Sequence, residues 1–185
     1  MSRKRAIEYF DEYLKRNNIS CMKDYDAEIG CMRYTFEFSA HKAPGGFVEA
    51  CIWWYERDAA EVRIYYNAEG MGICRESEYR EALFELLNWM NARIFMRSGT
   101  VGGIYEPSMI YTPRIYQTVD GYCDITITSM INYEVWAMTP LETNDYITIY
   151  CPELLDILAP AIFGVLMGEL KIAEAIAYLE KEVVC

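Results

Sequence analysis

Cysteine and histidine are the residue types of this sequence best suited to nucleophilic or metal chemistry. Seven cysteines lie at positions 21, 31, 51, 74, 123, 151 and 185, and no two of them form a Cys-x-x-Cys pair. His41 is the only histidine, so a site with two histidine ligands cannot form within one chain. The sequence therefore predicts no metal site, and it predicts that His41 is a surface residue in a polar turn.

Cys74 is the strongest candidate for a catalytic thiol. It lies beside Arg75 and just before a predicted helix, and amide donors at a helix start together with a cation lower the pKa of a thiol. An ordinary loop cysteine is the more common explanation of such a pattern. A thiol-dependent enzyme using Cys74 is therefore an alternative hypothesis. Our main expectation is that the chain is not an enzyme and has no catalytic residue and no cofactor.

Two further patterns have structural explanations. Asp120 and Asp124 resemble a pair of carboxylates for acid–base catalysis, but they flank an Asp-Gly sequence that is typical of a hairpin turn. The glycine-rich segment Gly99–Gly103 has no following Lys-Ser or Lys-Thr and precedes no predicted helix, so a phosphate-binding loop is not expected.

The charge balance restricts the possible partners. The chain has 17 Lys and Arg against 28 Asp and Glu, which gives a net charge of -11. Such a field repels the phosphates of nucleic acids and anionic membranes, so neither is expected as a partner. An acidic, immunity-type inhibitor that masks a basic protein is a second alternative, because the charge would steer the two proteins together.

The cysteine pattern and the apolar segments bear on location. An odd number of scattered cysteines favours reduced thiols in the cytoplasm over a disulfide framework. Residues 1–18 alternate charged and apolar residues and do not resemble a secretory signal. Residues 154–167 are apolar but contain Asp156 and Pro160, and a membrane span needs about 20 apolar residues. We therefore predict a buried helix there and a cytoplasmic protein.

The segment Glu81–Phe95 gives the strongest helix prediction. Apolar residues recur at i, i+4, i+7 and i+11, which is one stripe of an α-helix. We expect a helix over 77–97 that is laid across a sheet, with Ser77 as its N-cap and Ser98-Gly99 as its stop. The residues expected to be buried are Leu83, Leu87, Met90 and Ile94.

Period-two alternation on both sides of this helix predicts an antiparallel sheet. Strands are expected at 31–39, 47–56, 61–67, 100–105, 109–118 and 122–132, with a loop at 68–76. Residues 47–56 are apolar on both faces, so that strand is either covered on both sides or used for contact on one of them. Residues 146–150 are rich in β-branched and aromatic residues, and a short strand is one interpretation.

Helices are predicted at both ends of the chain, over 2–17 and from Pro152 onward, with a kink at Pro160. No linker, repeat or low-complexity segment interrupts the pattern. The sequence thus predicts one α+β domain over residues 1–185. In it, an antiparallel sheet is packed by N-terminal, central and C-terminal helices, in the order α-βββ-α-ββ(β)-α.

The stretch Leu86-Leu-Asn-Trp-Met-Asn91, followed by a small turn at Ser98-Gly99 and a strand at 100–105, resembles a stretch of the YbjN-like family. That family has Leu-Leu-Asn-x-x-Asn leading into a glycine turn and a strand. The order of elements is similar to the wider type III secretion chaperone-like fold. The resemblance implies an antiparallel sheet with helices packed on it, frequent dimerisation and a non-enzymatic binding role. It supplies no catalytic residues.

Aromatic content is the remaining functional signal. Sixteen tyrosines and four tryptophans occur in 185 residues, and tyrosine suits surfaces that are wet until a partner binds. We expect a chaperone- or adaptor-like homodimer that shields a client segment, or contacts its second subunit, through an aromatic-rich surface. The residues assigned to that surface are Trp53, Trp54, Tyr65, Tyr105 and Tyr116.

Overall fold

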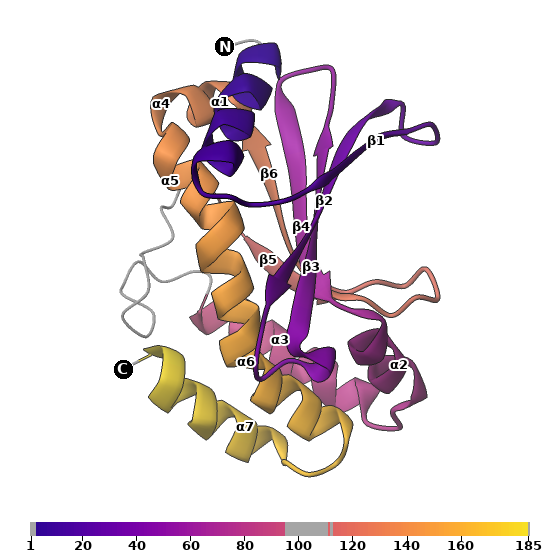
Figure 1. Ribbon diagram of the computed structural model, residues 1–185. Helices are drawn as coiled ribbons and strands as arrows, with labels where there is room; N and C mark the ends of the chain where they lie inside the picture. The colour runs from indigo at the N-terminus through magenta and orange to yellow at the C-terminus, as the bar shows by residue number, and fades with distance from the viewer. Residues whose placement is uncertain (1–2, 95–110, 112, 185) are drawn as a thin grey trace.

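The computed structural model describes residues 3–94, 111 and 113–184 (Figure 1). Six antiparallel strands form one sheet, and helices from the N-terminal, middle and C-terminal parts of the chain pack with it. The predicted α+β class is confirmed. The strands are β1 (Met22–Asp26), β2 (Cys31–Ser39), β3 (Phe47–Trp54), β4 (Ala59–Tyr66), β5 (Arg114–Gln117) and β6 (Ile125–Asn132). The helices are α1 (Arg3–Arg16), α2 (Ala68–Glu76), α3 (Arg80–Arg93), α4 (Tyr133–Met138), α5 (Pro140–Asp145), α6 (Cys151–Leu166) and α7 (Ile172–Leu179).

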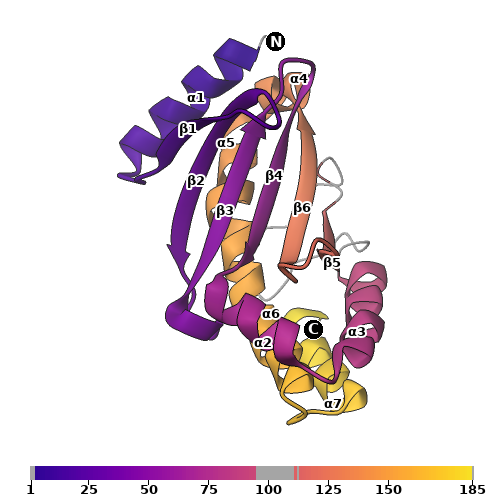
Figure 2. The same cartoon turned by 90° about the vertical axis from the view of Figure 1, so that its right-hand side faces the viewer.

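The sheet has the strand order β1-β2-β3-β4-β6-β5. Seen from the side, α1, α4, α5 and α6 lie on one side of it, whereas the β1–β2 and β5–β6 loops project on the other (Figure 1). Figure 2 looks onto that second face, with α6 behind the sheet. Among the described residues no helix lies across this face, although α2 borders one end of it. The sheet therefore has one face covered by helices and one that these helices leave open.

Aromatic side chains hold the helices on the covered face. Alternate residues of β3 and β4, such as Ile52, Trp54 and Ile64, point into this layer and are buried. The Trp54 ring centroid lies 4.8 Å from that of Trp136 in α4 and 5.9 Å from that of Phe10 in α1. Burial of such large rings, with tilted pair geometry, is a main source of packing energy. This aromatic part of the core lies between the covered face, α1 and α4, and the core continues under α6, whose Leu154, Leu155 and Leu158 are buried.

The central helix starts later than the sequence predicts, and it lies in another place. Ser77 is not its N-cap but the residue that ends α2, where the Ser77 hydroxyl donates to the Leu166 carbonyl at 2.6 Å. The helix α3 begins at Arg80 and packs beside β5, α6 and α7, while α6 is the helix that runs along the covered face (Figure 1). The predicted burial is confirmed for all four stripe residues, Leu83, Leu87, Met90 and Ile94.

Asn91 connects α3 to the edge strand β5. Its side-chain Nδ2 donates to the Ile115 carbonyl at 2.8 Å, and the Ile115 amide donates to Asn91 Oδ1 at 3.0 Å. Backbone groups on the outer side of an edge strand otherwise offer a template for a further strand. The last asparagine of the Leu-Leu-Asn-Trp-Met-Asn stretch therefore closes this part of the sheet edge.

Two observed elements differ from the sequence prediction. The segment predicted as a loop at 68–76 is the helix α2, whose N-cap Asn67 accepts hydrogen bonds from the amides of Glu69 and Gly70 at 3.0 and 3.2 Å. β1 adds a strand that was not predicted, because its side chains are mostly exposed and show no apolar alternation. The predicted strand at 100–105, with Tyr105, lies outside the described residues, and the predicted strands at 109–118 and 122–132 contain the shorter β5 and β6.

The segment Tyr146–Tyr150 is a π-helical turn and not a strand. It joins α5 to α6 in one helical run, and Tyr146, Ile147 and Tyr150 are buried in it. Packing has overridden the β propensity of these residues. The run Pro140–Leu166 is long and apolar enough to cross a membrane by length and composition, but 72% of its most apolar window is buried inside the protein, as in a core helix.

Candidate functional site

The strand register orders the side chains that point away from α1 and α6, and we call this surface the open face. Directly opposed residues of antiparallel strands carry their side chains on the same side. Three rows consequently cross the open face. They are Asp24, Arg33, Trp53, Glu61 and Met130; then Thr35, Cys51, Arg63, Thr128 and Arg114; then Glu37, Glu49, Tyr65, Thr126 and Tyr116.

Polar partners hold Trp53 in the middle of the open face. The Trp53 indole Nε1 donates to Asp26 Oδ2 at 3.1 Å, and the Arg63 guanidinium lies 5.1 Å from the centroid of the tryptophan ring. Arg63 Nε donates to Glu61 Oε1 at 2.6 Å, and the Tyr55 hydroxyl donates to Glu61 Oε2 at 2.5 Å. The ring is thus fixed and half-buried, which lowers the entropy that a partner would have to remove on binding.

Arg33 forms the second fixed cation of the surface. Its Nε and Nη2 donate to the two carboxylate oxygens of Asp24 at 3.1 and 2.5 Å, and its Nη1 lies 3.5 Å from Asp26 Oδ2. Hydrogen bonds from Arg33 hold the pKa of Asp24 below its usual value. Amide donation from Ile29, followed by the Trp53 indole, lowers the pKa of Asp26. Both aspartates are therefore ionised at neutral pH and neutralise Arg33.

A groove of about 480 Å³ lies over the open face, bordered by α2 and by the β5–β6 loop. Tyr65 lines it, with its hydroxyl 3.3 Å from Cys51 Sγ. Burial raises the pKa of Tyr65, so its hydroxyl stays neutral and can donate or accept a hydrogen bond. The lining residues are Arg33, Glu49, Cys51, Trp53, Arg63, Tyr65, Met71, Thr118, Tyr122, Asp124 and Thr126.

The two aspartates of the β5–β6 loop differ in role. Asp120 Oδ1 accepts from the Thr118 hydroxyl at 2.8 Å and from the Tyr122 amide at 3.1 Å, so the predicted turn role holds for Asp120. A turn role does not explain the Asp124 side chain, whose Oδ1 is buried without a hydrogen-bond partner in the described part of the chain. Burial raises the pKa of Asp124, and the neighbouring charges of Asp120 and Glu49 raise it further.

The structure separates the five residues that the sequence assigns to a contact surface. Trp53, Tyr65 and Tyr116 lie half-buried on the open face, with Trp53 in the first row and both tyrosines in the third. Trp54 is fully buried on the covered face, so its assignment to an accessible surface is wrong for this fold. The residue next to Trp53 must point to the opposite side of the sheet. Tyr105 lies outside the described residues.

Sequence reasoning missed the charged residues of the groove. Arg33, Glu49 and Arg63 are the polar members of alternating strands, and Glu49 and Arg63 border the aromatic Trp53 and Tyr65 in the register. Their alternation places them off the core. Which of them meet is decided by the strand register, and no signal in one sequence gives that register directly.

Cys74 does not have the environment of a nucleophile. It lies inside α2 and is fully buried, instead of preceding the central helix at an accessible position. Burial raises the pKa of the Cys74 thiol to about 11, whereas reactive cysteines have depressed pKa values and access to solvent. His41 is exposed in a turn, as predicted. Within the described ranges, no group of three His, Cys, Asp or Glu side chains is placed to hold a metal ion.

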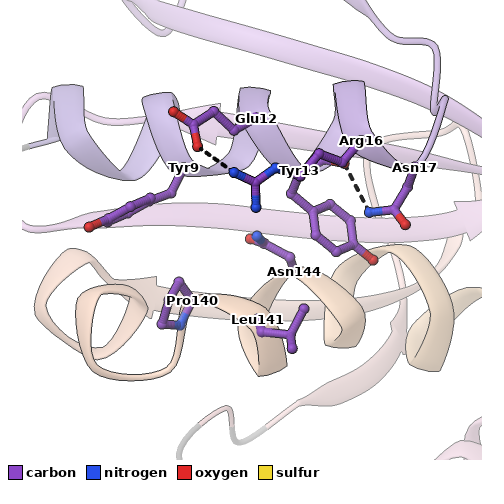
Figure 3. A pocket seen from close by; sticks show the side chains of 8 residues that line it. All are labelled: Tyr9, Glu12, Tyr13, Arg16, Asn17, Pro140, Leu141 and Asn144. Atoms are coloured by element: carbon purple, nitrogen blue, oxygen red, sulfur yellow. Dashed lines mark hydrogen bonds and ion pairs between the residues drawn. The ribbon is translucent and has the colours of Figure 1, made fainter.

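A second pocket, of about 430 Å³, lies between α1 and α5 (Figure 3). Tyr13 lines it and donates from its hydroxyl to Asp145 Oδ1 at 2.7 Å, with Thr148 Oγ1 2.9 Å away. Burial raises the pKa of Tyr13 to about 12. Asn144, also in the wall, accepts from the Trp136 indole at 2.9 Å. These polar groups already satisfy each other, which favours a structural role in joining α1 to α5.

Comparison with known proteins identifies no relative of this chain, since no protein-family model, no curated protein and no solved structure matches it. The resemblance to the YbjN-like family therefore stays a prediction from the sequence. The groove on the open face is the site that the structure itself distinguishes.

Proposed function

We propose that the protein is a non-enzymatic, chaperone- or adaptor-like binding module that uses the open face to hold a segment of another protein. The main support is one observation: the described helices cover one face of the sheet, and the other has a groove of about 480 Å³ lined by Trp53 and Tyr65, with Tyr116 in the same row as Tyr65. Aromatic residues dominate the energetics of protein interfaces. The protein then works by contact, in the cytoplasm, where free thiols such as Cys51 persist.

A photo-crosslinking experiment tests this proposal. A photoreactive phenylalanine analogue at Thr128, which lies beside Arg63 on the open face, should form a discrete adduct with another protein in native cells. The same analogue at Ala137, an exposed position on α4, is the matched control. Adding Trp53→Ala should abolish the Thr128 adduct while circular dichroism remains unchanged. Equal adducts from both positions, or a Thr128 adduct that survives Trp53→Ala, would contradict the proposal.

Homodimerisation is a separate part of the proposal. Sedimentation equilibrium would measure the mass of the purified chain directly, and a mass of twice 21.5 kDa is expected. A Thr128 adduct with a second copy of the chain would place the dimer contact on the open face, whereas a dimer without such an adduct would leave this face to the client.

An acidic inhibitor of a basic protein is the second candidate function, and the net charge of -11 favours it. Electrostatic steering raises association rates and is screened by salt. An inhibitor of this kind should bind its target with an association rate that falls steeply with ionic strength. An adaptor held mainly by Trp53 and Tyr65 should show little dependence on salt.

A further inference from the structure

Two glutamates on the open face lie opposite each other. Glu37 of β2 pairs in register with Glu49 of β3, and the rest of their row consists of Tyr65, Thr126 and Tyr116. Like charges directly across a sheet destabilise it. Neither glutamate forms an ion pair with a described residue. This end of the open face therefore holds uncompensated negative charge.

Asp124 adds a third carboxylate to the same end. It lines the groove together with Glu49, and its Oδ1 is buried without a hydrogen-bond partner in the described structure. Asp124 as a whole is half-buried, but a carboxylate oxygen that is removed from water without a donor is costly, and elsewhere that cost is offset by a paired cation or by hydrogen bonds. The unpaired oxygen thus lowers the stability of the folded protein, and a role in binding would explain why it is present.

The two arginines of the groove are already neutralised. Arg33 is held by both oxygens of Asp24, and Arg63 is bound to Glu61 and stacked on Trp53. Moving either one to Asp124 would break these short contacts. Arg63 attracts Asp124 only through its charge, without a hydrogen bond, so a cation in direct contact with Asp124 must come from outside the set of described lining residues.

The walls of the groove suit one kind of cation. Trp53, Tyr65 and Met71 line it, and the long aliphatic stems of lysine and arginine pack well on such surfaces while the charged end reaches polar groups. We propose that the groove binds a lysine or arginine side chain from a basic segment of a partner protein, whose cationic end pairs with the carboxylates of Glu49 and Asp124. This inference rests on the proposed function and names the chemistry of its partner.

The partner at this site is a different protein and not a second copy of the chain. Two copies would bring together two chains of charge -11 and two faces with unpaired carboxylates. A basic partner would instead gain from the negative field of the whole protein, which raises its rate of encounter.

A peptide titration tests the inference. The probe is acetyl-GLKTRVG-amide, and its counterpart carries acetyl-lysine and citrulline in place of lysine and arginine. Each is titrated into isotope-labelled full-length protein while NMR follows the Trp53 indole signal, assigned with Trp53→Phe. The charged peptide should shift this signal, and Asp124→Asn or Glu49→Gln should weaken its binding by about 10-fold or more, the usual cost of a lost charge pair.

The matched control is Glu85→Gln, which makes the same charge change at an exposed position of α3 and should leave the affinity nearly unchanged. Equal weakening by Glu85→Gln, equal binding of the uncharged peptide, or no shift with either peptide would overturn the inference. If spermidine displaced the peptide at a concentration lower than that of the peptide, the assignment of the partner as a protein would be overturned. If the uncharged peptide binds equally, or if Thr128 still crosslinks a partner, the proposed function survives and only the preference for a cation fails.

Discussion

Trp53 and Trp54 are neighbours on β3, yet they lie in two different environments. Trp54 is fully buried among Phe10, Tyr34 and Trp136 on the covered face. Trp53 is half-buried on the open face, where Asp26 and Arg63 hold it. Successive side chains of a strand point to opposite faces, so one of these tryptophans stabilises the core and its neighbour is available for recognition.

The two faces also differ in how their polar groups are treated. On the covered face, the Ser129 and Tyr146 hydroxyls pair with each other, 2.5 Å apart, and buried groups without a partner among the described residues, such as the Trp54 indole Nε1 and the Tyr150 hydroxyl, are neutral. On the open face, Asp24 and Arg33 form an ion pair that remains partly exposed, and such pairs contribute little to stability. The carboxylates of Glu49 and Asp124 lack even that compensation. The open face is thus arranged at some cost to folding, as expected of a binding surface.

The largest difference between the faces should appear when each tryptophan is truncated. Trp54→Ala should lower the free energy of unfolding by about 3–5 kcal/mol, because it leaves a large cavity in the core. Trp53→Ala should cost only about 1–2 kcal/mol, since it removes a partly exposed cation–π contact and one hydrogen bond. Chemical denaturation of both variants measures the two values. Equal losses would mean that the open face is as much a part of the core as the covered one.

The helix α2 offers a second comparison, between its packed side and its free side. A Cβ at Gly70 would lie 2.7 Å from Tyr66 Cβ and 3.1 Å from Phe163 Cζ, whereas a Cβ at Gly72 would meet nothing within 4 Å. Gly70→Ala should therefore destabilise by about 1–3 kcal/mol through overpacking. Gly72→Ala should stabilise by about 0.5–1 kcal/mol, because alanine favours the helix. Thermal unfolding measures the melting temperature of both variants. If both temperatures shifted in the same direction, α2 would not pack as described.

The parts of the fold that the sequence predicted best are those with strong periodicity. The apolar stripe of α3 and the alternation of β2 and β4 are local patterns, and burial in the structure follows them. α2 escaped prediction because Gly70 and Gly72 suggest a loop. Its stability comes from the Asn67 cap and from close packing on Tyr66, which local composition does not reveal.

The site was harder to predict than the fold. A strand that is apolar on both faces shows that Trp53 and Trp54 are both important, but not which of them points to a partner. Asp124 looked like a second turn residue, and its backbone amide and carbonyl do bond to Thr118, but only the Asp120 side chain accepts hydrogen bonds in the turn. What distinguishes Asp124 is its buried, unpaired Oδ1 in the groove that Glu49 also lines, and that is set by strand register and loop geometry.

Substitutions at Asn91 and Asn88 test how α3 holds β5, the edge strand that belongs to both faces of the sheet. Asn91→Ala should destabilise by about 1–3 kcal/mol, because the amide and carbonyl of the buried Ile115 lose their side-chain partners. Asn88→Ala, one helical turn earlier at an exposed position, should change stability by no more than about 0.5 kcal/mol. Urea denaturation compares them, with amide hydrogen exchange of β5 as a local measure. Unchanged protection of β5 in Asn91→Ala would contradict the assigned role.

The smallest effect should come from Asp124, whose substitution should stabilise the protein, as Gly72→Ala should. Its pKa is raised in the folded protein by burial and then by the charges of Asp120 and Glu49, so the folded state binds its proton more tightly than the unfolded state does. Stability from this group is present at pH values below the ordinary aspartate pKa and is lost as pH rises through the raised folded pKa. Asp124→Asn should therefore increase stability at neutral pH, on the order of 0.5 kcal/mol, and the gain should shrink toward about pH 4.

The matched change in the same loop is Asp120→Ala, which removes the acceptor of two hydrogen bonds and should destabilise by about 1 kcal/mol. Differential scanning calorimetry at neutral and acidic pH measures both variants. A stabilised Asp124→Asn protein that has also lost affinity for the basic peptide would show that the open face gives up stability for binding. Asp124→Asn lowering stability at neutral pH would mean that its carboxylate has a stabilising partner, and the open face would then resemble the covered one.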